Sequence, residues 1–99
     1  MIREVVILYI KAGQEAAFEK AFASAQSISI FMPGYVSHQL QGCIENGSPY
    51  ILLVNWQTLE DLTIGFRQSP AYQTWRELLH HFYDPFPVVE QYRPIFSHV

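Results

Sequence analysis

The sequence predicts an α+β fold in which two helices cover one face of a four-stranded antiparallel sheet, and three observations support this prediction. Three segments read as strands, because their side chains separate into two alternating sets: residues 2–10, 35–44 and 50–56. Two longer segments instead repeat apolar residues every three or four positions, as helices do: residues 11–29 and 69–83. An Asn46-Gly47 dipeptide, which tolerates a tight hairpin turn, separates the second and third strand segments.

The first strand, residues 2–10, has two alternating sets of side chains that are both largely apolar. A strand of this kind is expected to be covered on both faces of the sheet. The next segment, residues 11–29, places Phe18 and Phe22 at helical spacing and carries Glu15 early, where the helix dipole favours an acid. We therefore expect the first helix here, packed on one face of the sheet.

The second strand, residues 35–44, is expected at an edge of the sheet. Val36, His38 and Leu40 form one face of it, and the residues between them are mostly polar. The third strand, residues 50–56, is apolar on both sides and pairs with the second strand in a hairpin. This contrast places the third strand in the interior of the sheet.

Two helices are expected before the last strand. A short one spans about residues 59–66, and a longer one spans about residues 69–83, with Ser69 as its N-cap and Pro70 at its first position. The last strand is expected over residues 86–93. The resulting order β-α-β-β-α-β is the ferredoxin-like plan, whose sheet order 4-1-3-2 places the two most apolar strands in the centre.

Two helices can cover only one face of a four-stranded sheet, so the apolar side chains on the other face need a partner. A two-fold pairing of two such sheets would supply this partner. We therefore expect a homodimer that closes sheet to sheet, in which each chain forms a single domain over residues 1–99.

Composition and charge limit the classes of function. The chain is 49% hydrophobic, 15% aromatic and 15% charged, which favours a face buried against another subunit or a ligand. The net charge of -3, with six scattered Lys and Arg residues, argues against nucleic-acid binding. No apolar run approaches the roughly 18 residues of a membrane span, and the single cysteine, Cys43, favours a reducing compartment. We therefore expect a cytoplasmic protein that binds no membrane.

Three stretches of the sequence resemble one protein family: LLVNWQTLEDL, FRQSPAYQTW and VVEQY. The resemblance is to the antibiotic biosynthesis monooxygenase superfamily of dimeric α+β barrels, and it covers nearly the whole chain. It implies a small oxygenase that holds a flat aromatic substrate between the helices and the sheet. Some members act on polycyclic quinols or anthrones without metal or flavin, and others degrade haem.

The haem-degrading branch is not expected here. In that branch an Asn, a Trp and a His serve the porphyrin, and the corresponding positions of this chain hold Val6, Phe66 and Arg76. Many relatives also have a His near the position of Gly65, which has no side chain. The resemblance therefore implies an oxygenase without haem, and we expect no cofactor.

The second long helix holds the first candidates for chemistry. An apolar stripe along it, which includes Trp75, is typical of a helix packed on a sheet. Tyr72, Arg76 and His80 follow at steps of four residues and form a polar column at the margin of this stripe. His80 could act as a general base near neutral pH, and Arg76 could stabilise an oxyanion. The alternative is a solvated helix face whose side chains contact water or one another.

Other candidates come from the strands and from the end of the short helix. His38 is a second candidate base if it lines the same cavity as Tyr72, and otherwise a hydrogen-bonded core or interface residue. Asn55 and Trp56 are adjacent on a strand, so only one of them can reach a pocket on the helix side. Phe66, together with the aromatic residues of the second long helix, completes the expected pocket wall.

A metal site is not expected. His80 and His81 are adjacent, and adjacent helical residues diverge by about 100°, so the two rings do not chelate one ion well. The sequence also lacks a His-x-x-x-His pair or an acid cluster at ligand spacing.

We interpret the chain as a homodimeric, cofactor-independent monooxygenase that acts on a flat aromatic molecule of the quinol or anthrone kind. The alternative is a non-catalytic small-molecule-binding or structural homodimer of the same fold. The fold supports binding and catalysis alike, so the side chains that enter a cavity have to decide between the two.

Overall fold

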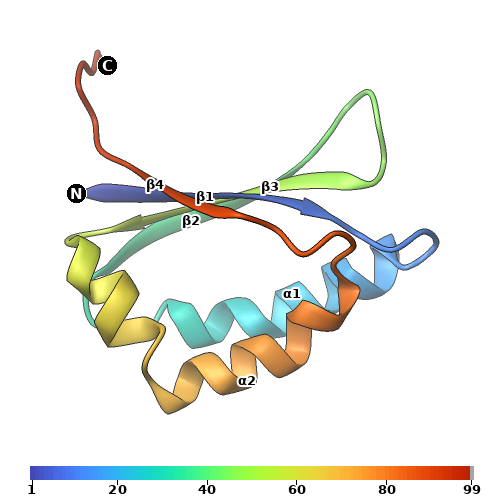
Figure 1. Cartoon of the computed structure of the whole chain (residues 1–99), viewed down its shortest axis with the longest axis horizontal. Coiled ribbons are helices and arrows are strands. Elements are labelled where there is room, and N and C mark those ends of the chain that lie inside the picture. The colour runs from blue at the N-terminus through green and yellow to red at the C-terminus, as the bar shows by residue number, and fades with distance from the viewer. Residues whose placement is uncertain (99) are drawn as a thin grey trace.

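The computed structural model describes residues 1–98, and its elements follow the order that the sequence predicts (Figure 1). The strands are β1 (Ile2–Tyr9), β2 (Tyr35–Gly42), β3 (Pro49–Trp56) and β4 (Val89–Tyr92). The α-helices are α1 (Glu15–Ser29) and α2 (Pro70–Leu79). A π-helix, η1 (Asp61–Phe66), precedes α2, and a 3-10 turn, η2 (His80–Phe82), follows it.

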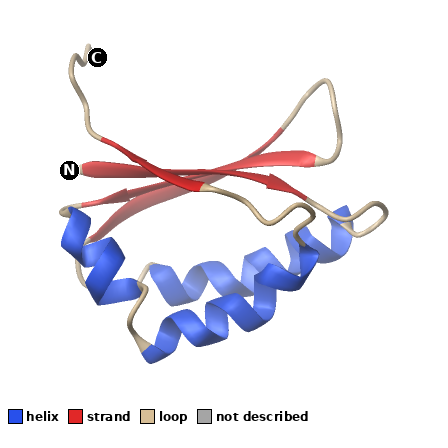
Figure 2. Cartoon of the chain, viewed as in Figure 1, coloured by secondary structure: helices blue, strands red, loops and turns tan. Residues whose placement is uncertain are grey.

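The strands form one antiparallel sheet in the order β2-β3-β1-β4, and α1 and α2 lie against the same face of it (Figure 2). This order confirms the predicted ferredoxin-like plan, with β1 and β3 in the centre. Val6 of β1 lies opposite Leu52 of β3 and Val89 of β4. Opposite residues of an antiparallel pair share a face, so these three side chains point toward the helices.

Side chains from the sheet and from both helices form one core. The sheet supplies Leu8, Val54 and Trp56, and each of them is almost completely buried. Phe18 of α1 and Leu79 of α2 belong to the same cluster and are fully buried. Burial of one large apolar side chain contributes about 1.5–3 kcal/mol, so these contacts are the main source of stability.

The opposite face of the sheet is apolar but uncovered in the single chain. Val5, Ile7 and Leu53 lie on this outer sheet face, and Ile7 is 49% exposed. Val6 and Leu8, which face the helices from β1, are buried, whereas these outward side chains are not. The prediction that β1 is covered on both faces therefore depends on a partner for the outer sheet face.

One prediction for β2 is wrong. Val36 is expected on the same face as His38, yet Val36 is exposed and Tyr35 contacts His38 instead. A β-bulge causes the difference, because Tyr35 and Ser37 pair with consecutive residues of β3 and Val36 has no partner. The extra residue shifts the alternation by one position.

The start of α2 is as predicted, but its end is not. Ser69 Oγ accepts a hydrogen bond from the backbone N–H of Tyr72 at 3.3 Å, which makes Ser69 the N-cap. The helix expected over residues 69–83 ends as an α-helix at Leu79 and tightens into η2. Tightening of a last turn into 3-10 geometry is a common way for a helix to end.

Strands β2 and β4 are shorter than predicted. The last strand begins at Val89 instead of residue 86, because the segment before it contains Pro87, which has no N–H to pair. The strand predicted over residues 35–44 ends at Gly42. The short helix expected over residues 59–66 is present mostly as the π-helix η1.

Leu62→Ala tests how strongly η1 is packed on the core. Leu62 is 0% exposed, so truncation leaves a cavity, and the free energy of unfolding should fall by about 2–5 kcal/mol. Leu59→Ala is the matched control, because Leu59 is 42% exposed and its loss should cost far less. Chemical denaturation followed by tryptophan fluorescence measures both variants. Equal losses would contradict this account of η1.

Candidate functional site

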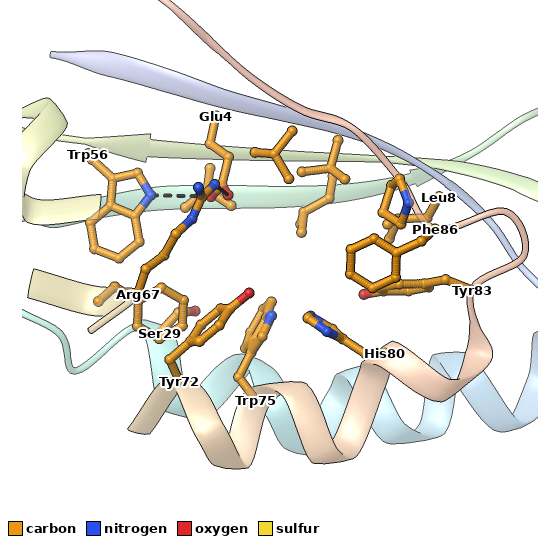
Figure 3. A pocket seen from close by; sticks show the side chains of 16 residues that line it. Glu4, Leu8, Ser29, Trp56, Arg67, Tyr72, Trp75, His80, Tyr83 and Phe86 are labelled. Atoms are coloured by element: carbon orange, nitrogen blue, oxygen red, sulfur yellow. Dashed lines mark hydrogen bonds and ion pairs between the residues drawn. The ribbon is translucent and has the colours of Figure 1, made fainter. Parts of the chain in front are cut away.

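A narrow cavity lies between the sheet and α2, with the end of η1 on one side and the loop before β4 on the other (Figure 3). Its volume is about 70 Å³, which is space for a few water molecules. Aromatic side chains form much of its wall: Trp56, Phe66, Tyr72, Trp75, Tyr83 and Phe86. Polar groups gather at two opposite ends of the cavity.

Glu4, Arg67 and Trp56 form the first polar end. Glu4 Oε2 accepts a hydrogen bond from Arg67 Nη2 at 3.2 Å, and Glu4 Oε1 accepts one from Trp56 Nε1 at 3.5 Å. The side chains of Glu4 and Arg67 are 12% and 30% exposed. Burial raises the pKa of Glu4, and the charge and hydrogen bond of Arg67 oppose this shift. One cation and one indole therefore hold the carboxyl group in place.

The local backbone explains why Glu4 and Arg67 meet. Glu4 faces the helices because it has the same strand parity as Val6. Arg67 follows η1, and its backbone N–H donates to the carbonyl of Leu62, five residues earlier, at 3.0 Å, as in a π-helix. From the end of this wider turn the Arg67 side chain extends into the cavity (Figure 3). Such turns are frequent at functional sites.

His80 lies at the second polar end, among aromatic rings. Its ring centroid is 6.0 Å from that of Tyr72, 5.5 Å from that of Tyr83 and 5.1 Å from that of Phe86. Burial and, to a smaller extent, the charge of Arg76 lower the pKa of His80. Within residues 1–98 no hydrogen bond occupies its ring nitrogens. A neutral imidazole with a nitrogen free to accept a proton therefore faces the cavity.

Tyr83 adds a hydroxyl group beside His80. Burial is the main cause that raises the pKa of Tyr83, and the negative charge of Glu4 adds to this shift. Its phenol therefore stays protonated at neutral pH. A protonated hydroxyl at this position can donate a hydrogen bond to a group in the cavity.

The structure brings five of the predicted site residues to this cavity: Trp56, Phe66, Tyr72, Trp75 and His80. Arg76 is not among the lining residues. Its side chain is exposed, because a long charged side chain at the margin of a helix stripe reaches water. Arg76 therefore acts on the site only through its charge, and a role in holding an oxyanion inside the cavity does not fit its position.

His38 does not line the cavity either. Its side chain extends from β2 toward α1. There its Nε2 is 2.9 Å from Gln26 Oε1, and its Nδ1 is hydrogen bonded to the Tyr35 hydroxyl. Burial lowers the pKa of His38. Because both ring nitrogens have partners, His38 fits the hydrogen-bonded alternative and not the role of a base that faces Tyr72.

Asn55 lies on the outer sheet face and cannot contact a molecule in the cavity. Its Oδ1 accepts a hydrogen bond from Arg3 Nε at 3.0 Å, and its Nδ2 donates one to Ser37 Oγ at 2.9 Å. Trp56, the next residue, is the one that faces the helices. Adjacent residues of a strand point to opposite faces of the sheet, so Asn55 and Trp56 cannot face the same side.

Among the cavity residues that the sequence predictions omit, three have ionisable side chains: Glu4, Arg67 and Tyr83. Glu4 carries a visible signal, since it is the one acid in the inward-facing set of β1, which is otherwise apolar. Arg67 carries none, because its direction depends on a π turn that α-helical periodicity does not reveal. Tyr83 follows the helix stripe and reads from sequence as one more packing aromatic.

The acidic, thiol and imidazole side chains are dispersed. Within residues 1–98, no group of three or more His, Cys, Asp or Glu side chains could hold a metal ion. Cys43 is exposed and does not line the cavity.

Comparison with known sequences points to one family. The family whose profile matches residues 1–78 is described as antibiotic biosynthesis monooxygenase. YczJ of Bacillus subtilis (strain 168), an uncharacterized protein, is 50% identical to this chain over 95 residues. The match covers 96% of this chain and 100% of YczJ.

Comparison with solved structures agrees with the sequence match. A Bordetella bronchiseptica protein assigned to the antibiotic biosynthesis monooxygenases is 29% identical, with a TM-score of 0.90 over 96% of this chain and 97% of that one. SnoaB of Streptomyces nogalater, a cofactor-independent oxygenase, is 18% identical, with a TM-score of 0.82 over 97% and 94% of the two chains. The second likeness concerns the fold alone.

Arg76→Gln tests the electrostatic coupling between α2 and His80. The pKa of His80 should lie below its ordinary value of 6.5 in the parent chain. Loss of the guanidinium should raise this pKa, because a nearby cation disfavours the imidazolium. Titration of the His80 ring protons by NMR measures both values. Arg93→Gln is the control, because Arg93 is an exposed arginine directly after β4 and does not contribute to the pKa shift of His80. Equal shifts in the two variants would contradict a local effect.

Proposed function

Because the chain belongs to the antibiotic biosynthesis monooxygenase family, we propose that it is a cofactor-independent monooxygenase that acts on a flat aromatic molecule of the quinol or anthrone kind. The observation that carries this proposal is the neutral imidazole of His80 at one end of an aromatic-walled cavity. SnoaB, which has a similar fold, is a cofactor-independent oxygenase, and this supports the choice of reaction class.

The proposed reaction needs a base, an oxidisable carbon and dioxygen. His80 removes a proton from the methylene carbon of an anthrone, which leaves a delocalised, electron-rich anion. The anion supplies the electrons that reduce dioxygen, and a bond forms between its carbon and one oxygen atom. The peroxide anion takes the proton back from His80, which restores the base. Loss of water from the resulting hydroperoxide then leaves a carbonyl group, so one oxygen atom stays on the substrate and the other leaves in water. The substrate is itself the reductant, and no further electron donor is needed.

Groups on the cavity wall would stabilise the substrate anion. The protonated hydroxyl of Tyr83, beside His80, can donate a hydrogen bond to the negatively charged peroxide oxygen that forms on the carbon facing His80. Phe66 and Trp75, with ring centroids 5.7 Å apart, offer apolar contact to a planar molecule. In this proposal Tyr83 takes the stabilising role that the sequence assigns to Arg76.

A polycyclic substrate is larger than the cavity, so part of the wall has to move. Pockets for molecules of this size occupy several hundred Å³, compared with about 70 Å³ here. Phe86 lines the cavity from the loop before β4 and is 64% exposed, so its displacement costs little buried surface. We propose that Phe86 turns outward when the substrate binds.

The alternative is a non-catalytic homodimer that binds a small aromatic molecule or serves a structural role. The small volume of the cavity is the observation that favours it, because this cavity does not admit a polycyclic substrate without rearrangement. Oxygen consumption separates the two functions, since only the enzyme should consume dioxygen with a quinol or an anthrone.

We propose a cytoplasmic location, as the sequence predicts. No helix within residues 1–98 has the length and apolar character that crossing a membrane requires. Cys43 is a free, exposed thiol, which a reducing compartment preserves.

We also propose that two copies pair through the outer sheet face. Val5, Ile7 and Leu53 present apolar side chains there on the two central strands. A two-fold axis through this face would bring the same patch of both copies together and bury it. This pairing would supply the cover that the apolar strand β1 lacks in the single chain.

His80→Ala should lower the rate of oxygen consumption by about a hundredfold, because the reaction would lose its general base. An oxygen electrode with a panel of quinols and anthrones measures the rate. His81→Ala removes the neighbouring exposed imidazole and should keep the parent rate. A parent that consumes no oxygen with any member of the panel would exclude the enzyme, and equal rates in the two variants would exclude His80 as the base.

Ile7→Lys should convert the dimer to a monomer, because it places a charge in the centre of the outer sheet face. Sedimentation at micromolar concentration measures the change. Ile44→Lys is the matched control, since Ile44 is 98% exposed in the loop between β2 and β3. A parent chain that sediments only as a monomer contradicts the pairing.

A further inference from the structure

The ion pair of Glu4 and Arg67 has no part in the proton transfer that we assign to His80, yet it lies in the same cavity at the opposite end (Figure 3). Removing two charges from water is costly, and apolar side chains of similar volume often stabilise a fold at least as well. The neighbouring inward positions of β1, Val6 and Leu8, are apolar and buried. The pair is therefore a polar site that the core does not require.

Both members of the pair keep unused hydrogen-bonding capacity. An ionised carboxylate has about four acceptor positions, and Glu4 accepts two hydrogen bonds, one of them long at 3.5 Å. A guanidinium has five N–H donors, and only one hydrogen bond from the Arg67 side chain is present within residues 1–98. Free donors and free acceptors therefore lie side by side at this end of the cavity.

We propose that Glu4 and Arg67 together bind two neighbouring oxygens of the aromatic substrate, a phenolic hydroxyl and a second hydroxyl or a carbonyl beside it. Glu4 accepts the hydrogen bond of the hydroxyl, and Arg67 donates to the neighbouring oxygen. This inference rests on the proposed function, which places the substrate in this cavity with its reacting carbon toward His80.

Charge favours a ligand with two neutral neighbouring oxygens over a carboxylate and over a bare hydrocarbon. A carboxylate would be attracted by Arg67 but repelled by the adjacent carboxylate of Glu4, so the pair gives it little net attraction. A bare hydrocarbon would displace water from both charges without replacing its hydrogen bonds. A pair of neutral oxygens, one donor and one acceptor, satisfies both side chains.

The first test compares two probes that differ by one hydroxyl group, naphthalene-2,3-diol and naphthalen-2-ol. The parent chain should bind the diol at least about tenfold more tightly than the mono-ol. The mono-ol has a single oxygen, so it leaves either Glu4 or Arg67 without a hydrogen-bond partner. Calorimetric titration in buffer without oxygen measures both affinities and prevents oxidation. Equal affinities, or no binding of the diol at millimolar concentration, would overturn the proposal.

The second test removes the pair. The double variant Glu4→Met/Arg67→Met replaces both charges with apolar side chains of similar length, and it should remain folded because neither charge is left without its partner. Thermal melting by circular dichroism checks the fold. The double variant should bind both probes equally, whereas Arg76→Met, which removes an exposed arginine, should keep the preference for the diol. A preference that survives in the folded double variant overturns the proposal.

These binding measurements are independent of the proposed reaction. A preference for the diol in a parent chain that consumes no oxygen supports the oxygen-pair site and excludes the monooxygenase. Oxygen consumption by a parent chain that binds both probes equally supports the monooxygenase and overturns the oxygen-pair site.

Discussion

The two-residue alternation of the central strands is the constraint on which the rest of the structure depends. In β1 it turns Glu4 and Val6 toward the helices and Ile7 away from them, and in β3 it sends Trp56 and Asn55 to opposite sides. One set of side chains builds the core and the cavity, and the other builds the outer sheet face. The cavity and the proposed pairing of two copies therefore arise from the same two strands.

Much of the fold can be predicted from the sequence because its signals are local. The strand order and the opposite directions of Asn55 and Trp56 follow from residue patterns, and Ser69 marks the start of α2. The errors occur where one extra residue shifts the strand alternation or the helical repeat of the residues that follow it. The bulge at Val36 does this in β2, and the π turn does it before Arg67. Periodicity assumes a constant repeat, so one extra residue redirects the side chains that follow it.

The candidate site is less predictable than the fold, because its charged side chains are long and their partners are remote. Arg76 has the spacing expected of a cavity residue, yet its side chain lies in water, whereas Arg67 reaches the buried Glu4. Which arginine enters the cavity depends on where the buried acid Glu4 lies. Glu4 and Arg67 are 63 positions apart in the sequence. Local patterns do not relate positions at such a distance.

The π-helix η1 makes the backbone geometry of a segment, and not only its residues, part of the site. Consecutive residues of an α-helix are about 100° apart around the helix axis, whereas a π turn, with hydrogen bonds between residues five apart, places them closer together. With the same residues in α-helical geometry, Arg67 would point to another side of the helix, and the cavity would lose its cation although every side chain that lines it had been kept. A substitution that converts η1 to an α-helix would therefore change the site without altering a cavity residue.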